Sequence, residues 1–212
     1  MNASRRSQVY CVLAQALRPP TPELVTWAVD GSLRHLLTDA LGEAAVSLEA
    51  LRQPGTPAVI EERLSKEHYR LFRHPRHRLE LTESVYKPWS SAGTSGTPFA
   101  HERGLLMGEP ARHLLELYRL TGWTLPVEFA SRPDHLALEL AFMAYLVEYF
   151  GPVDHAQFLD DHLDWLPDLL QAAADWEPLP FYATVLATTQ VWIEQESTMS
   201  RKELETLQRC WE

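Results

Sequence analysis

The sequence predicts an all-α protein, a single bundle of roughly ten helices around one buried central helix. Apolar residues recur at helical spacing along most of the chain, and no run bounded by turns alternates apolar and polar residues. The stretch 136–150 is apolar around nearly its whole circumference, with Glu139 and Glu148 as its only charged residues. Such a helix belongs in the middle of a bundle. It is too short for a membrane span, which needs about 20 apolar residues.

The central helix has a start signal and a stop signal in the sequence. Ser131 is followed three residues later by Asp134, with Pro133 between them, and Gly151-Pro152 follows the apolar body. A hydroxyl and a carboxylate at this spacing can cap the first turn of a helix reciprocally, and proline is tolerated there. The sequence therefore predicts a capping box formed by Ser131 and Asp134.

The first third of the chain is predicted to be helical. Arg5-Arg6 superficially suggests a twin-arginine export signal, but the apolar residues from Val9 to Leu17 fall at helical spacing and favour an amphipathic first helix. Thr21-Pro22 and Thr56-Pro57 each have the cap-then-proline signature of a helix start.

The rest of the chain alternates loops with helices. The segment 73–78 is predicted to be a solvated basic loop, 83–89 to be extended or turn-like, and 90–98 to be polar and mobile. Ser200 and Glu203 form a second capping-box pattern, which predicts a separate final helix. The other predicted helices lie at 111–122, 158–166, 167–176 and 180–193.

Composition and charge limit the kinds of partner and the cell compartment that the sequence predicts. The 212 residues have a net charge of −10, and 133–200 contains 12 acidic residues but no lysine or arginine. This acidic segment either aids solubility or attracts a cationic partner. Its negative charge disfavours binding to the phosphates of nucleic acid. Cys11 and Cys210 are the only cysteines, which fits a reducing compartment, so we expect the cytoplasm.

The nine histidines raise the hypothesis of a metal-dependent helical phosphohydrolase of the HD type, with His113 and Asp134-His135 as ligands. The histidine spacings are irregular, however, and no complete catalytic set or phosphate-binding glycine loop is visible. The sequence predicts no enzyme, no cofactor and no metal. Trp89, beside the polar segment, could instead line a groove for an apolar peptide.

Three ordered stretches carry a family resemblance. Arg132-Pro133-Asp134-His135, followed by Glu139-Leu140-Ala141, resembles the Pro-x-Asp-His-type motif of the TorD/DmsD/NarJ family, the cytoplasmic maturation chaperones of molybdenum oxidoreductases. The stretch 68–72 with 83–86 is similar to that family's N-terminal pattern, and 158–167 with 180–182 is similar to its C-terminal one. The resemblance covers about Tyr10 to Ile193.

The resemblance implies a single all-helical chaperone domain over 1–212, with a hinge-like loop near 123–131. Such a protein binds the N-terminal, twin-arginine-type signal segment of a molybdopterin oxidoreductase subunit of the DMSO reductase type, and holds it for cofactor insertion. Its partner would be that catalytic subunit, with Tat translocase components as further candidate partners, and the chain would be a monomer or a dimer. The positions expected to form or flank the peptide site are Tyr69, Phe72, Ser84, Tyr86, Trp89, Glu128, Pro133, Asp134 and His135. An adaptor that binds a folded partner is the remaining alternative.

Overall fold

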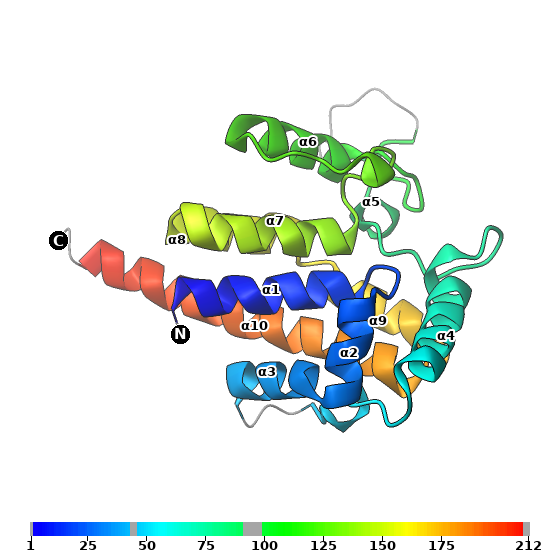
Figure 1. Cartoon of the computed structure of the whole chain (residues 1–212). Coiled ribbons are helices and arrows are strands. Elements are labelled where there is room, and N and C mark those ends of the chain that lie inside the picture. The colour runs from blue at the N-terminus through cyan, green and yellow to red at the C-terminus, as the bar shows by residue number, and fades with distance from the viewer. Residues whose placement is uncertain (1, 43–45, 91–98, 210–212) are drawn as a thin grey trace.

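The computed structural model describes residues 2–42, 46–90 and 99–209 (Figure 1). Within these residues the chain is helical, and the only β pairing is an isolated bridge between Thr82 and His135. The predicted all-α class is confirmed. The elements are α1 (Ala3–Ala16), α2 (Pro22–Asp30), α3 (Ser32–Leu41), η1 (Glu49–Leu51), α4 (Pro57–His68), η2 (Tyr69–Arg73), α5 (Glu83–Tyr86), α6 (Glu109–Thr121), η3 (Val127–Phe129), α7 (Leu136–Tyr149), α8 (Pro152–His162), α9 (Leu166–Ala174) and α10 (Pro180–Arg209).

Helix α7 forms the centre of the bundle, as its apolar circumference predicts. Leu140, Phe142 and Met143 are completely buried, and Glu139 is buried with them. Helix α1 lies along α7, with α10 on the other side of α1 (Figure 1). Helix α6 lies at the edge of the molecule (Figure 1); it contacts α5, and its Tyr118 ring packs against Phe142 of α7 at 4.8 Å between ring centroids.

The first helix is confirmed, and its two arginines have structural roles. The guanidinium of Arg6 is buried and bonds both carboxylate oxygens of Glu196 in α10 at 3.0 Å. The Tyr10 hydroxyl donates to the same carboxylate at 3.2 Å. Arg5 pairs with Asp39 of α3 at 3.3 Å. These bonds join α1 to α10 and to α3.

The predicted capping box at Ser131 and Asp134 is wrong. Helix α7 begins at Leu136, and its N-cap is His135, whose Nδ1 accepts a hydrogen bond from the Ala137 amide at 3.2 Å. Asp134 cannot act as a local cap because its carboxylate is completely buried and bonded to Ser84, 50 positions earlier in the chain.

Two further local predictions are wrong. The segment 83–89 was expected to be extended or turn-like, but it begins with the short helix α5. Ser200 does not start a separate helix: α10 runs unbroken from Pro180 to Arg209, and Ser200 is buried in its interior. No glycine or proline interrupts 181–209, so the pattern at Ser200 was not accompanied by any break. The prediction for 90–98 falls almost wholly outside the described residues, at 91–98.

Among the described residues, no helix combines the length and the apolar character needed to cross a bilayer.

Candidate functional site

The Pro-x-Asp-His stretch and the Glu83-Ser84 stretch meet in a short backbone pairing. The Glu83 amide donates to the Asp134 carbonyl at 2.9 Å, and the Leu136 amide donates to the Leu81 carbonyl at 2.8 Å. The Asp134 carboxylate accepts from the Ser84 amide at 2.8 Å and also from the Ser84 hydroxyl. Burial raises the pKa of Asp134, although the bonds from Ser84 oppose that rise. Together these contacts fix the start of α7 against α5.

Beside this pairing, Glu83 is completely buried and contacts two basic side chains. His162 Nδ1 lies 2.9 Å from Glu83 Oε2, and Lys87 Nζ lies 2.8 Å from Glu83 Oε1. Lys87 also pairs with Asp164 at 2.5 Å. Burial alone would lower the pKa of Lys87, but the Glu83 and Asp164 carboxylates raise it above its usual value. The amino group therefore stays charged and joins α5 to the end of α8.

Glu139 completes the cluster of buried carboxyl groups. It is fully buried, and the Trp165 indole donates to its Oε2 at 3.1 Å. Burial, with the nearby Glu83 and Asp134 carboxylates, raises the pKa of Glu139 well above its usual value. Trp165 in turn stacks on Tyr86 at 5.1 Å between ring centroids. The raised pKa means that the Glu139 carboxyl group favours its neutral form in the folded protein.

We call Ser84, Glu83, Asp134, Glu139 and His162 the polar joint. Its members come from all three sequence stretches that carry the family resemblance. Pro133 lies beside it, with its carbonyl accepting from the Tyr118 hydroxyl at 2.8 Å. Because Ser84 and Asp134 are buried and bonded to each other, their position is that of residues holding the fold together. The two surface depressions described below are lined by residues near this joint.

The structure does not bring His113, Asp134 and His135 together as a metal-ligand set. His113 Nδ1 lies 2.8 Å from His162 Nε2, Asp134 is bonded to Ser84, and His135 caps α7. Across the part of the chain that the structure describes, no cluster of three or more His, Cys, Asp or Glu side chains could hold a metal ion.

On one side of the joint is a hollow of about 270 Å³, which we call the basic hollow. Of the predicted site residues, it brings together Phe72, Glu128 and His135. Tyr69 lies on the neighbouring π-helical turn η2 and is 54% exposed. The charged residues lining the hollow are Arg18, Arg73, Arg78, Arg132 and Glu128. The charged residues that line a site predicted to receive arginines are therefore themselves mainly arginines.

His135 contributes a neutral hydrogen-bond donor to the basic hollow. Because its Nδ1 accepts from the Ala137 amide, the ring proton lies on Nε2. Burial, together with the charges of Arg132, Arg18 and Arg73, lowers the pKa of His135 to about 3. Burial likewise lowers the pKa of the neighbouring His68 to about 4. Both rings are uncharged at neutral pH.

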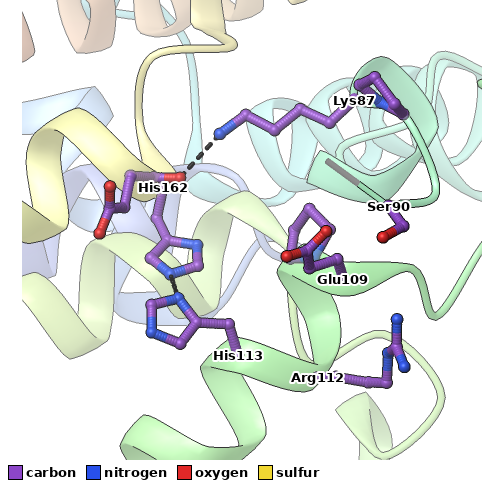
Figure 2. A pocket seen from close by; sticks show the side chains of 9 residues that line it. Lys87, Ser90, Glu109, Arg112, His113 and His162 are labelled. Carbon is purple, nitrogen blue, oxygen red and sulfur yellow. Dashed lines mark hydrogen bonds between the residues drawn. The ribbon is translucent and has the colours of Figure 1, made fainter. Parts of the chain in front are cut away.

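On the other side of the joint, α6 and α8 form the walls of a longer depression, which we call the α6–α8 groove. Its polar end is a hollow of about 670 Å³ whose lining includes Lys87, Glu109 and Arg112 (Figure 2). Its apolar end is a hollow of about 130 Å³ lined by Leu117, Phe142, Leu146, Phe150 and Phe158, with Asp154 and Gln157 on the same helix as Phe158. His113, Asp161 and His162 line both hollows, so the two hollows adjoin at these residues.

Trp89 lies near the polar end of the α6–α8 groove. Its ring packs edge-on against Phe99 at 5.6 Å, and the Arg112 guanidinium lies 5.8 Å from its centroid. Trp89 is partly buried, and its neighbours Pro88 and Ser90 line the groove. Its expected contact with a peptide stays a prediction.

Sequence reasoning missed most of the α6–α8 groove. His162, Asp161 and Phe158 belong to the third stretch of the resemblance, but no site role was expected for them. Leu117 and Phe142 were expected only as helix-packing residues. The available signal was the acidic excess of 133–200, which places Asp154 and Asp161 on the groove.

The fold and these contacts define an all-α protein in which three separated motifs converge on one buried polar joint between two surface depressions. A family model described as "Nitrate reductase delta subunit" matches residues 35–173. The chain therefore belongs to the nitrate reductase delta subunit family, and the resemblance to TorD, DmsD and NarJ is confirmed.

Three curated relatives share the same name. "Chaperone protein TorD" of Shewanella piezotolerans is 26% identical over 117 residues, covering 54% of this chain and 54% of the relative. The protein of the same name in Vibrio cholerae is 26% identical over 117 residues, covering 48% of this chain and 53% of the relative. That of Shewanella pealeana is 24% identical over 101 residues, covering 47% and 46%. The chain thus spans about half the length of the curated relatives that it matches.

Proposed function

We propose that this protein is a molybdoenzyme maturation chaperone without catalytic activity. In this proposal it binds the N-terminal signal segment of a catalytic subunit of the DMSO reductase type, and holds that segment until the cofactor is inserted. Membership of the nitrate reductase delta subunit family and relatives named as chaperones support the general role. The cytoplasm is the expected location.

The observation that carries the signal-segment proposal is the two-part α6–α8 groove. A twin-arginine signal combines two arginines with an apolar stretch. In the groove, an apolar hollow at Phe142, Leu146 and Phe150 adjoins a polar one whose charged lining residues are Asp161, Glu109, Lys87 and Arg112. The client's apolar side chains would enter the first hollow, and its guanidinium groups would pair with carboxylates near the second.

The charge and the exposure of residues in and near the groove support this orientation of the signal segment. Asp161 and Asp154 are exposed, and the Asp161 carboxylate forms no ion pair within the described ranges. Leu120 and Tyr149 are 64% and 68% exposed and lie on α6 and α7, the helices that line the apolar hollow. The hollow of about 130 Å³ has room for roughly one large apolar side chain. Much of a bound segment would therefore lie across the groove rather than inside it.

The test is calorimetric titration with synthetic twin-arginine signal peptides at low and high salt. We expect binding that weakens with salt, because exposed charges are screened. Asp161→Asn should weaken it about threefold, and Leu117→Lys should weaken it at least tenfold. Trp89→Ala tests the expected contact between Trp89 and the peptide.

Matched controls separate the groove from general surface effects. Asp39→Asn and Val59→Lys change an exposed carboxylate and an exposed apolar residue on α3 and α4. Equal effects of the groove and control variants would contradict the groove as the binding site. If no signal peptide binds but a folded catalytic subunit co-purifies, the adaptor alternative would replace this proposal.

A further inference from the structure

The charge of the basic hollow is opposite in sign to the net charge of the whole chain. The protein has a net charge of −10, yet four arginines line this hollow with only Glu128 as an acidic lining residue. Glu80, just behind, pairs with Arg78 at 2.5 Å and with Arg132 at 3.3 Å. Positive charge held this close together repels itself unless an anion is nearby. The charge of the hollow therefore favours an anionic ligand and disfavours an arginine side chain.

Two of the four arginines remain available to an incoming group. Arg73 is exposed and, within the ranges described, has no hydrogen bond or ion pair. Among the residues that the structure describes, Arg18 forms an ion pair with Glu128 alone, at 2.8 Å, and both side chains are about half exposed. The Nε2–H of His135 is a third donor, and its proton is fixed in place by the cap at the start of α7.

The existing contacts show what kind of anion the arginines accept. In the resting structure both bound anions are carboxylates of the chain itself, Glu128 on Arg18 and Glu80 on Arg78 and Arg132. Glu128 lies on the exposed 3-10 turn η3, next to Val127, which is 89% exposed. Its ion pair is therefore weak and open to exchange.

The surroundings favour a polypeptide over a small inorganic anion. The Phe129 ring lies under the Arg18 guanidinium at 5.4 Å, Phe72 lines the hollow, and Tyr69 is exposed beside it. These rings offer apolar contact to residues next to a bound carboxylate, contact that a free phosphate could not use.

We propose that the basic hollow binds a carboxylate-bearing peptide segment of a partner protein, and that Glu128 occupies Arg18 until this segment displaces it. The carboxylate would receive hydrogen bonds from Arg18, Arg73 and the His135 Nε2–H. This site is separate from the α6–α8 groove and does not depend on the signal-segment proposal. It also gives Glu128, which was expected only to form or flank the signal-peptide site, the role of a competitor for the client's carboxylate.

The test measures binding of a short capped peptide that alternates glutamate with leucine, using the full chain and a glutamine-for-glutamate peptide as the control. We expect only the acidic peptide to bind, less tightly as salt rises. Arg18→Ala and Arg73→Ala should each weaken it about tenfold, since each removes a charged donor. Arg119→Ala, an exposed arginine on α6 paired with Glu116, is the matched control and should have no effect.

Glu128→Gln is the decisive variant because the two roles of Glu128 predict opposite results. Removal of the competing carboxylate should tighten binding of the acidic peptide about two- to fivefold, and leave binding of a twin-arginine peptide unchanged. The proposal is overturned if Glu128→Gln weakens twin-arginine binding and the acidic peptide does not bind. It is also overturned if inorganic phosphate displaces the peptide at an equal concentration, because the hollow would then be a simple oxyanion site.

Discussion

Asp134 and His135 are neighbours in one motif, yet their side chains face opposite regions of the molecule. Asp134 points into the polar joint, is completely buried, and bonds to Ser84. His135 lines the basic hollow and offers it an Nε2–H. The backbone at His135 is extended and pairs with Thr82, and the side chains of His135 and Asp134 lie on different sides of it. One half of the motif thus holds the fold together, while the other half faces a site that a ligand can reach.

Asp134→Ala should cause the largest loss of stability. It leaves the buried amide and hydroxyl of Ser84 without their acceptor, so we expect the free energy of unfolding to fall by about 3 kcal/mol. Asp134→Asn keeps one acceptor oxygen and should lose about 1 kcal/mol. Urea denaturation measures both. If Asp134→Ala is as stable as the wild type but no longer binds peptides, Asp134 belongs to a binding site and the comparison fails.

Lys87→Met tests the charged part of the polar joint and should lower stability by about 2 kcal/mol. The change removes the ammonium group that pairs with the fully buried Glu83 carboxylate. Lys202→Met, on the exposed part of α10, is the matched control. Adding Glu83→Gln to Lys87→Met should restore part of the loss, because the unpaired buried charge is then gone. A loss equal to that of the control would contradict a structural role for Lys87.

Glu139→Gln should change the pH dependence of stability. The pKa of Glu139 is raised by burial in the folded state, so the stability that this group contributes is fully present below its unfolded pKa of about 4.5 and is lost as the pH rises through the folded value. Glu139→Gln has no ionisable group at this position and therefore does not lose this stability as the pH rises. Its advantage over the wild type should grow with pH, with a slope of up to about 1.4 kcal/mol per unit. Melting temperatures between about pH 5 and pH 9 measure this slope. Parallel curves would show that Glu139 is ionised in the folded state.

The fold was predictable from the sequence because its signals are local. Helical spacing and the all-round apolar character of 136–150 correctly indicated a buried central helix. The two capping boxes were wrong for a related reason: Ser131 with Asp134 and Ser200 with Glu203 match a local pattern, but long-range contacts decide the outcome. Asp134 bonds to Ser84 instead, and Ser200 is buried within α10.

The candidate site was less predictable because its charges come from separate segments. Arg73 and Arg78 were interpreted as part of a solvated loop, and no pattern indicated that Arg18 and Arg132 would join them. Phe72, Glu128 and His135 do lie together, as the resemblance implies, but in surroundings of opposite charge to those expected. The sign of a site's net charge depends on which chain segments meet there. The spacing of residues along the sequence does not contain that information.

The smallest predicted effect on stability is at His135, and it sharpens the comparison most. His135→Ala removes the N-cap of α7 and should cost about 1 kcal/mol. His135→Asn supplies a new side-chain acceptor at the cap and should recover most of this, since asparagine is among the best N-cap residues. Asparagine is too short to extend a donor to the position of Nε2, so His135→Asn should still bind the acidic peptide more weakly than the wild type. Full recovery of both stability and peptide binding would show that His135 acts only through the cap. Recovery of stability alone would separate the two functions within a single side chain, with Nδ1 holding the helix and Nε2 facing the ligand.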